Sequence, residues 1–172
     1  MSLLKIIKER RSIRKFQPKP IPEEIINKLI EALIWAPSAG NLQSRKFYFV
    51  FDNEIKEKLA VAAFGQSSIA QAPLVVVGCA DDRISRRYGK RGEELYSICD
   101  VSASIQNMML LIHEQGLGSV WMGAFDEKEV AKILNLPETL HPIAIVPIGY
   151  PAEKPSAPPR VSKEEAIKFI RH

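Results

Sequence analysis

The chain carries the sequence DVSASIQNMMLLIHEQGLGSVWMGAF at residues 100–125, and this stretch decides what kind of fold it adopts. Residues 100–115 are apolar around most of a helix circumference, and Gly116 is the residue that ends the helix. A helix with so little polar surface lies in the centre of a fold or in a subunit interface, and we favour the interface because a domain of this size has little interior. The residues after it, GSVWMGAF (118–125), predict a short strand that runs into a glycine-containing turn.

The rest of the chain alternates between helical and extended patterns. Apolar residues at helical spacing predict further helices, at residues 2–10, 22–35, 53–64 and 126–134. Runs of β-branched and aromatic residues predict strands, at residues 46–52, 73–80 and 141–151. Strands separated by helices, without hairpin turn signals, indicate an α/β or α+β sandwich and exclude a helical bundle or a barrel. The length of 172 residues predicts one domain that spans residues 1–172.

Composition excludes several classes of protein. The chain is 46% apolar and 26% charged, which is ordinary for a globular protein and excludes disorder. We expect no membrane helix and no signal peptide, since no apolar run approaches about 18 residues. Cys79 and Cys99 form no CxxC pair, and the three histidines have no metal-ligand spacing, so we expect no metal site. These features predict a soluble cytoplasmic protein.

Positive charge is concentrated in two places, although the net charge is only +4. Residues 1–20 contain seven basic residues against Glu9 alone, and residues 83–91 (RISRRYGKR) contain five basic residues and no acid. Such patches attract phosphates, on a small cofactor or on nucleic acid. The glycines of residues 116–123 lack the GxGxxG spacing and follow a helix instead of a strand, which excludes a Rossmann site. If the chain is an enzyme, its chemistry comes from a bound cofactor.

Three segments carry residues suited to such a cofactor. Residues 10–14 (RRSIR) offer rigid guanidinium groups for a phosphate, or they simply oppose the dipole of the helix before them. Residues 36–43 (APSAGNLQ) offer two amides and small residues for a planar ring, or they simply turn the chain. In residues 121–125 (WMGAF), a glycine-alanine backbone suits close approach to a ring, or the segment is a strand end with a core aromatic.

These segments occur in an order that resembles the FMN-dependent nitroreductase family. The resemblance rests on RRSIRKF (10–16), APSAGNLQ (36–43), the helix within residues 100–119 and WMGAF (121–125), and it covers residues 10 to about 160. It implies an α+β fold, a three-layer sandwich with a central, mostly antiparallel sheet flanked by helices. It also implies an intertwined homodimer that holds two FMN molecules at the subunit interface.

The resemblance also implies a set of flavin-binding residues. Arg10 would hold the phosphate, Arg14 would lie near the pyrimidine edge of the flavin, and Arg160 would close over the phosphate. The loop after the second helix would come from the other subunit, and the WMGAF turn would face the ring near N5. The full set is Arg10, Arg11, Ser12, Arg14, Pro37, Ser38, Ala39, Asn41, Gln43, Met122, Gly123, Ala124 and Arg160.

We therefore expect an NAD(P)H-dependent flavin oxidoreductase of the nitroreductase type. NADH or NADPH would pass a hydride to flavin N5 and leave, and a small oxidised acceptor such as a nitroaromatic or a quinone would then take the electrons. No side chain need act as acid or base, so no catalytic residue is assigned. The alternatives are another flavin reaction on the same fold, such as dehydrogenation or reductive dehalogenation, or a basic nucleic-acid-binding protein.

The chain departs from the family pattern in two places. Ser44 and Arg45 stand where the family commonly has proline and tryptophan, so we expect a less rigid loop there. The segment before residue 100 is short and basic at residues 83–91, where relatives often carry a helical lid over the substrate.

Overall fold

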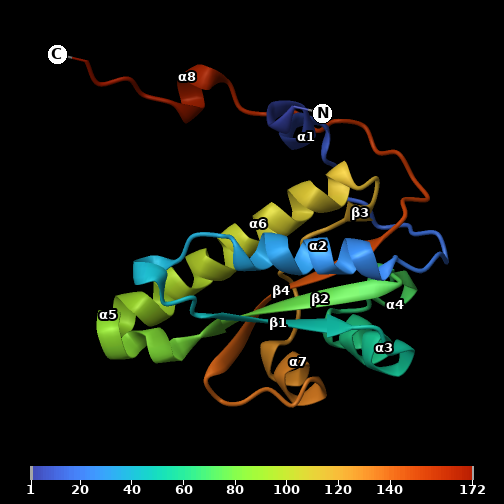
Figure 1. Cartoon of the computed structure of the whole chain (residues 1–172), viewed down its shortest axis with the longest axis horizontal. Coiled ribbons are helices and arrows are strands. Elements are labelled where there is room, and N and C mark those ends of the chain that lie inside the picture. Colours follow the sequence, from blue (N-terminus) through green and yellow to red (C-terminus); the bar gives the residue numbers. More distant parts are fainter. Residues whose placement is uncertain (1, 172) are drawn as a thin grey trace.

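An antiparallel sheet runs through the centre of the molecule, in the strand order β1-β2-β4-β3 (Figure 1). The computed structural model describes residues 2–171, and within them the strands are β1 (Arg45–Val50), β2 (Leu74–Asp81), β3 (Gly118–Ser119) and β4 (Leu140–Gly149). Each strand pairs with its neighbours in antiparallel register, so that Val77 of β2 lies between residues of β1 and β4. β2, which is apolar up to its last residue Asp81, is thus an inner strand, as the continuous apolar run predicts.

Helices cover both faces of the sheet and give three layers (Figure 1). On one face lie α2 (Glu23–Ile34) and α6 (Ser97–Glu114), which pack on Leu74 and Val76 of β2. On the other face lie α3 (Asn53–Ala62), α4 (Ser68–Gln71) and α7 (Glu127–Ile133), which pack with the opposite side of the same strand. The α+β fold with a flanked antiparallel sheet is therefore confirmed.

Local signals explain where these helices begin. Pro22 precedes α2, and Glu23 and Glu24 occupy its first turn, where the helix dipole favours negative charge. Asp52 accepts a hydrogen bond from the Ile55 amide at the start of α3, and Asp126 caps α7 in the same way. Shorter helices complete the description: α1 (Leu3–Glu9), η1 (Ala39–Asn41), η2 (Asp82–Ile84), α5 (Ser85–Arg91), η3 (Gly92–Tyr96) and α8 (Lys163–Ala166).

The apolar helix α6 is a core element of the chain. Its residues Val101, Ile105, Met108 and Ile112 are buried between the sheet and α2. The sequence allows two positions for this helix, the centre of the fold or a subunit interface, and from the sequence alone we favour the interface. Its burial within one chain is enough to explain its apolar character. By length and composition alone, the continuous helical stretch Asp82–Glu114 would be long enough to cross a membrane. Core helices pass the same test, so this length carries no argument for a membrane.

The short strand predicted at the start of residues 118–125 is confirmed. Only Gly118–Ser119 is a strand, and Met122 makes an isolated bridge to Ile145. Gly123 and Ala124 are exposed beyond that bridge, so no further β-ladder forms there.

The C-terminal residues leave the body of the molecule. Beyond Pro151 the chain runs past α1 as an extended segment that contains only the short helix α8 (Figure 1). Four large apolar side chains of this tail are exposed, namely Val161, Ile167, Phe169 and Ile170. The tail does not contribute to the core of its own chain.

Candidate functional site

A cluster of arginines lies where α1 ends. Arg10 is the C-cap of α1, and the positive charges of Arg11 and Arg160 lie close enough to repel its guanidinium. Burial, followed by repulsion from Arg11 and Arg160, lowers the pKa of Arg10 below its usual value. Within the described part of the chain, the buried Nη1 atom of Arg10 has no hydrogen-bond partner. A partly buried cation with like charges around it and an idle donor indicates an anion-binding site.

The backbone after the cluster is fixed beside the sheet. Ser12 bridges Ser119 of β3, and the Ile13 amide donates to the Ser119 carbonyl at 3.0 Å. The Arg14 amide donates to Glu153 Oε1 at 2.5 Å, and the Arg14 side chain is exposed. The residues predicted from RRSIR thus occupy one edge of the molecule, and the tail that begins at Glu153 carries Arg160 to the same edge.

A cleft of about 480 Å³ adjoins the arginine cluster. Arg11, Glu153 and His113, from the C-terminal end of α6, are among the residues that line it. The buried Nε2 atom of His113 also lacks a partner among residues 2–171. Sequence reasoning did not select His113, because a lone histidine on an apolar helix carries no distinctive signal.

The WMGAF turn follows directly from β3. Met122 is buried and exchanges both backbone hydrogen bonds with Ile145, at 3.0 and 2.9 Å. Gly123 and Ala124 are exposed, and a side chain at Gly123 would meet only Trp121 Nε1, at 3.7 Å. This backbone is therefore open to the close approach of a flat ligand.

Gln66 is a further residue at this turn that sequence reasoning missed. Its Nε2 atom donates to the Ala124 carbonyl at 2.9 Å and to the Ala63 carbonyl at 3.0 Å. The sequence around it is an ordinary polar connection after α3, so only the folded chain shows that it holds the turn.

The predicted loop after α2 has an unusual backbone. Gly40, Asn41 and Gln43 all have φ values of +54° to +56°, in the left-handed region that non-glycine residues seldom adopt. Leu42 and the side chains of Asn41 and Gln43 are exposed. The Ala39 amide already donates to Asp100 and the Gln43 amide to Ser38 Oγ, so the two side-chain amides are what the loop offers to a ligand.

Hydrogen bonds tie the loop to its neighbours. Arg45 donates to the carbonyls of Ile34, Ala36 and Pro37 at 2.8–3.0 Å. Asp100 accepts from the amides of Ala39, at 2.9 Å, and Ser44, at 3.3 Å. Ser44 and Arg45, which stand where the family commonly has proline and tryptophan, thus tie this loop by hydrogen bonds to α6 and to the end of α2.

One chain does not bring the two halves of the predicted site together. The loop bonds to Asp100, near the start of α6, whereas Arg11 borders the same cleft as His113, near its end. Thirteen residues of α-helix separate these positions, which is about 20 Å along the axis. The RRSIR segment lies at one end of α6, beside β3, and residues 37–43 lie at the other (Figure 1). The WMGAF turn runs from β3 across the sheet, where Met122 bridges Ile145 of β4 and Ala124 accepts from Gln66.

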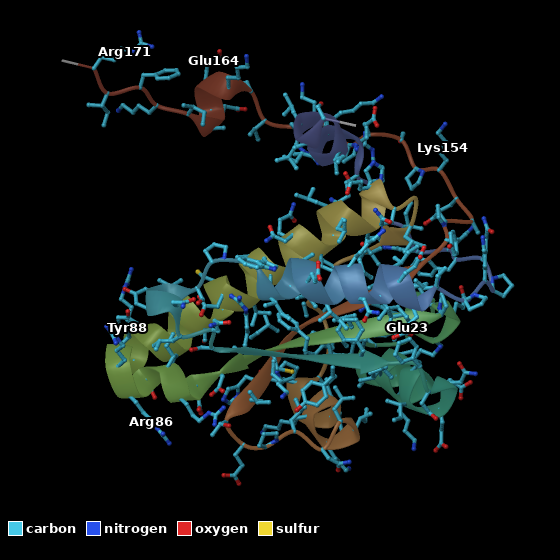
Figure 2. The ribbon with its side chains drawn as sticks, viewed as in Figure 1. Glu23, Arg86, Tyr88, Lys154, Glu164 and Arg171 are labelled. Carbon is cyan, nitrogen blue, oxygen red and sulfur yellow. The ribbon has the colours of Figure 1, made fainter. Side chains whose placement is uncertain are left out.

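The second basic run belongs to a different surface. Residues 83–91 lie in η2 and α5, at the end of the molecule that carries η1 (Figures 1 and 2). Arg83 is paired with Asp81, and Lys90 lies 3.2 Å from Glu94. The two basic patches thus occupy opposite ends of α6 and form no continuous track for a nucleic acid. Phe47, Tyr48 and Phe49 are partly buried and pack against the core, whereas Phe51 is exposed.

The arginine cluster fits the phosphate of FMN. The unpartnered Nη1 of Arg10 can donate a charge-assisted hydrogen bond to a phosphate oxygen. A dianion there would also relieve the repulsion of Arg10 by Arg11 and Arg160. The open Gly123–Ala124 backbone and the amides of Asn41 and Gln43 suit the mixed donor and acceptor edge of a flavin ring.

Comparisons with known proteins agree with this arrangement. A model of the nitroreductase family matches residues 7–82 and 62–150 of the chain. An NADH dehydrogenase of Thermus thermophilus is 33% identical over 187 residues, which cover 92% of this chain and 91% of the relative. An NAD(P)H FMN reductase of Bacillus subtilis is 30% identical over 176 residues, which cover 94% of this chain and 71% of the relative. The structure of an NADPH:FMN oxidoreductase from Vibrio harveyi, solved with NAD+, superposes with a TM-score of 0.90 at 27% identity, over 99% of this chain and 77% of that chain.

Proposed function

The chain belongs to the nitroreductase family and is an NAD(P)H-dependent flavin oxidoreductase that uses FMN, and from this premise we propose that it works as a homodimer whose two chains complete each FMN site together. The observation that carries the proposal is the separation of the two half-sites by about 20 Å along α6. A second copy that places its Ser38–Ser44 loop beside the arginine cluster unites them. Twofold symmetry then creates two equal sites.

Exposed apolar side chains support a partner at the loop. Ile34 and Trp35, directly before the loop, are 57% and 83% exposed, and Ile98 is exposed two residues before Asp100. A group of exposed apolar side chains next to polar residues is typical of a protein interface. We assign the exposed apolar side chains of the tail to the same dimer, in which each tail lies along the other chain.

When bound, FMN accepts a hydride at N5 from NADH or NADPH and supplies electrons to an oxidised small molecule such as a nitroaromatic or a quinone. Arg10, Arg11 and Arg160 hold the phosphate, because Arg11 and Arg160 repel the partly buried Arg10 cation and a bound dianion would relieve that repulsion. Ser12 and Arg14 lie next to the cluster in sequence and bind the adjoining part of the cofactor. No side chain is required to donate or accept a proton in this sequence of steps.

The remaining assigned residues shape the ring pocket. Met122 anchors the turn through its two bonds to Ile145, so that the backbone of Gly123 and Ala124 can lie against the ring. From the second chain come the amides of Asn41 and Gln43. The other members of that loop, Pro37, Ser38 and Ala39, permit close approach and set its direction.

The compartment is proposed from the thiols. Cys79 is buried, Cys99 is exposed, and neither is in a disulfide within the described chain. An exposed unpaired thiol suits a reducing compartment, and we propose the cytoplasm.

The flavin content of the purified protein tests this function. The protein should be yellow, release FMN on heating, and bind it again at one FMN for each chain. NADH or NADPH should bleach the flavin absorption without oxygen, and a quinone should restore it. A colourless protein that cannot be loaded with FMN would contradict the proposed function.

A further inference from the structure

The loop that carries Asn41 and Gln43 adopts a conformation that needs support. Two of its residues with positive φ, Asn41 and Gln43, are not glycine, and an isolated chain disfavours this conformation for such residues. A free loop would therefore spend most of its time in other conformations. In those conformations the two amides would not face a ligand together.

Asp100 is placed to supply that support. Its side chain is buried, with 3% of the residue exposed, on the first turn of α6. Oδ1 accepts from the Ala39 amide at 2.9 Å and Oδ2 accepts from the Ser44 amide at 3.3 Å. One carboxylate thus joins the two ends of the segment in which Asn41 and Gln43 lie.

Other contacts fix the loop against the same helix pair but do not replace this bridge. Arg45 binds carbonyls that precede the loop, and its cation also lies close enough to Asp100 for their charges to interact. The Tyr88 side chain of α5 lies directly over Gly40, beside the loop (Figure 2). Neither Arg45 nor Tyr88 accepts a hydrogen bond from the Ala39 or Ser44 amide.

We propose that Asp100 is a positioning residue for the flavin: its two carboxylate oxygens hold the Ala39–Ser44 segment so that the Asn41 and Gln43 amides face the FMN bound to the partner chain. The proposal rests on the proposed function and adds a role for a residue that does not itself touch the cofactor. It also explains a buried, charged side chain on an otherwise apolar core helix.

The test is the substitution Asp100→Asn, studied in the full-length protein. Asparagine has the same shape but presents an NH2 group to one of the two amides, so one end of the loop is released. We expect hydrogen exchange at Ala39 or Ser44 to accelerate at least tenfold in the FMN-free protein. We expect the Kd for FMN of the folded protein to rise at least tenfold.

The matched control is Ser97→Ala. Ser97 is equally buried on the same helix and also makes one side-chain hydrogen bond, to the Glu93 carbonyl, away from the loop. This variant should leave both the FMN Kd and the exchange of the two loop amides within about twofold of wild type. If Asp100→Asn does not fold, Asp100→Glu serves the same test, since it keeps the charge but displaces both oxygens from the amides.

Three results have distinct meanings. Unchanged exchange at Ala39 and Ser44 overturns the inference, because the carboxylate then does not hold the loop. Faster exchange with an unchanged FMN Kd also overturns it, because the loop conformation then does not matter for the flavin. Wild-type protein that binds no FMN contradicts the proposed function instead, and in that case only the exchange result still reports on Asp100.

Discussion

Arg10 is a residue whose effect on stability and on binding should have opposite signs. In the FMN-free chain its charge is partly buried beside Arg11 and Arg160, with an idle donor atom, so it destabilises the fold. With a phosphate bound, the same charge is compensated. Arg10→Met should therefore raise the free energy of unfolding of the FMN-free protein by about 0.5 kcal/mol or more. It should also raise the FMN Kd at least tenfold.

Urea denaturation and flavin-quenching titration measure the two effects. Lys8→Met is the matched control, since Lys8 is an exposed cation on the same helix. The control should change neither quantity appreciably. An Arg10 variant that is less stable without FMN would show that the cluster is not strained by its own charge.

Cys79 gives the stability a specific dependence on pH. Burial raises the pKa of this thiol to about 12, whereas the unfolded chain loses the proton near its ordinary value of about 9. Between these values the folded state binds the extra proton, so unfolding becomes easier as pH rises. The thiol contributes a slope approaching 1.4 kcal/mol per pH unit above pH 9, and its contribution is constant below that range.

The measurement is urea denaturation from pH 8 to pH 10.5. Cys79→Ala should lower stability at pH 8 through the lost side chain but flatten the decline at high pH. Cys99→Ala, at the exposed cysteine, should keep the wild-type slope. If the unfolding free energy fell equally steeply with pH in all three proteins, the pKa of Cys79 would be the same in the folded and the unfolded chain, which would contradict the prediction.

At the scale of elements, η1 and α5 pack closely only because residue 40 is a glycine, which has no side chain. A Cβ at Gly40 would overlap the Tyr88 hydroxyl, and the φ of +54° would strain it further. Gly40→Ala should therefore destabilise the protein by about 2 kcal/mol. Tyr88→Phe removes the overlapping oxygen and leaves ring carbon at 3.3 Å, so the double variant should recover about half of that loss.

A double-mutant cycle of unfolding free energies measures this coupling. Tyr88→Phe cannot recover the share of the lost unfolding free energy that comes from backbone strain, because that strain arises from Gly40→Ala alone. Strictly additive free energies would contradict the contact between α5 and η1.

The elements differ in how far they could be predicted from sequence. Helices α2 and α7 were predicted closely, because Pro22 and Asp126 mark their starts and apolar residues repeat at helical spacing. β2 was predicted because eight residues without polar side chains before Asp81 read as an inner strand. A short strand before a glycine-containing turn was predicted within residues 118–125, but propensity does not show that pairing with β4 stops after Ser119.

The site was predictable in composition but not in support. The arginines, the two amides and the open glycine turn were selected as residue types with suitable chemistry. Gln66 and Asp100 lie 58 and 61 residues from the backbone groups Ala124 and Ala39 that they bind, and Arg45 folds back on carbonyls 8 to 11 residues before it, so no local pattern indicates these contacts. Their roles depend on tertiary packing, which only the folded chain supplies.

At the scale of the whole molecule, a site shared between chains predicts complementation. One variant carries Arg10→Ala and Arg160→Ala, another carries Asn41→Ala and Gln43→Ala, and neither alone should retain FMN. When the two are unfolded and refolded together in equal amounts, about half of the dimers are mixed, and each mixed dimer has one intact site. About a quarter of all sites should then bind FMN, as flavin absorbance per chain will show.

Two controls make the result decisive. Each variant refolded alone must remain colourless, and wild-type protein carried through the same procedure must recover its flavin. No recovery of FMN in the mixture would mean that both half-sites belong to one chain.

Helix α6 touches both half-sites of a single chain, with Asp100 near one end and His113 near the other. In the proposed dimer, its length therefore sets the distance between the two FMN sites. Each residue added to it would turn one end by about 100° and shift it by about 1.5 Å. Single insertions or deletions within this helix should thus misplace one half-site relative to the other and be selected against. Only changes in length near a whole number of turns would keep both half-sites facing in the same directions.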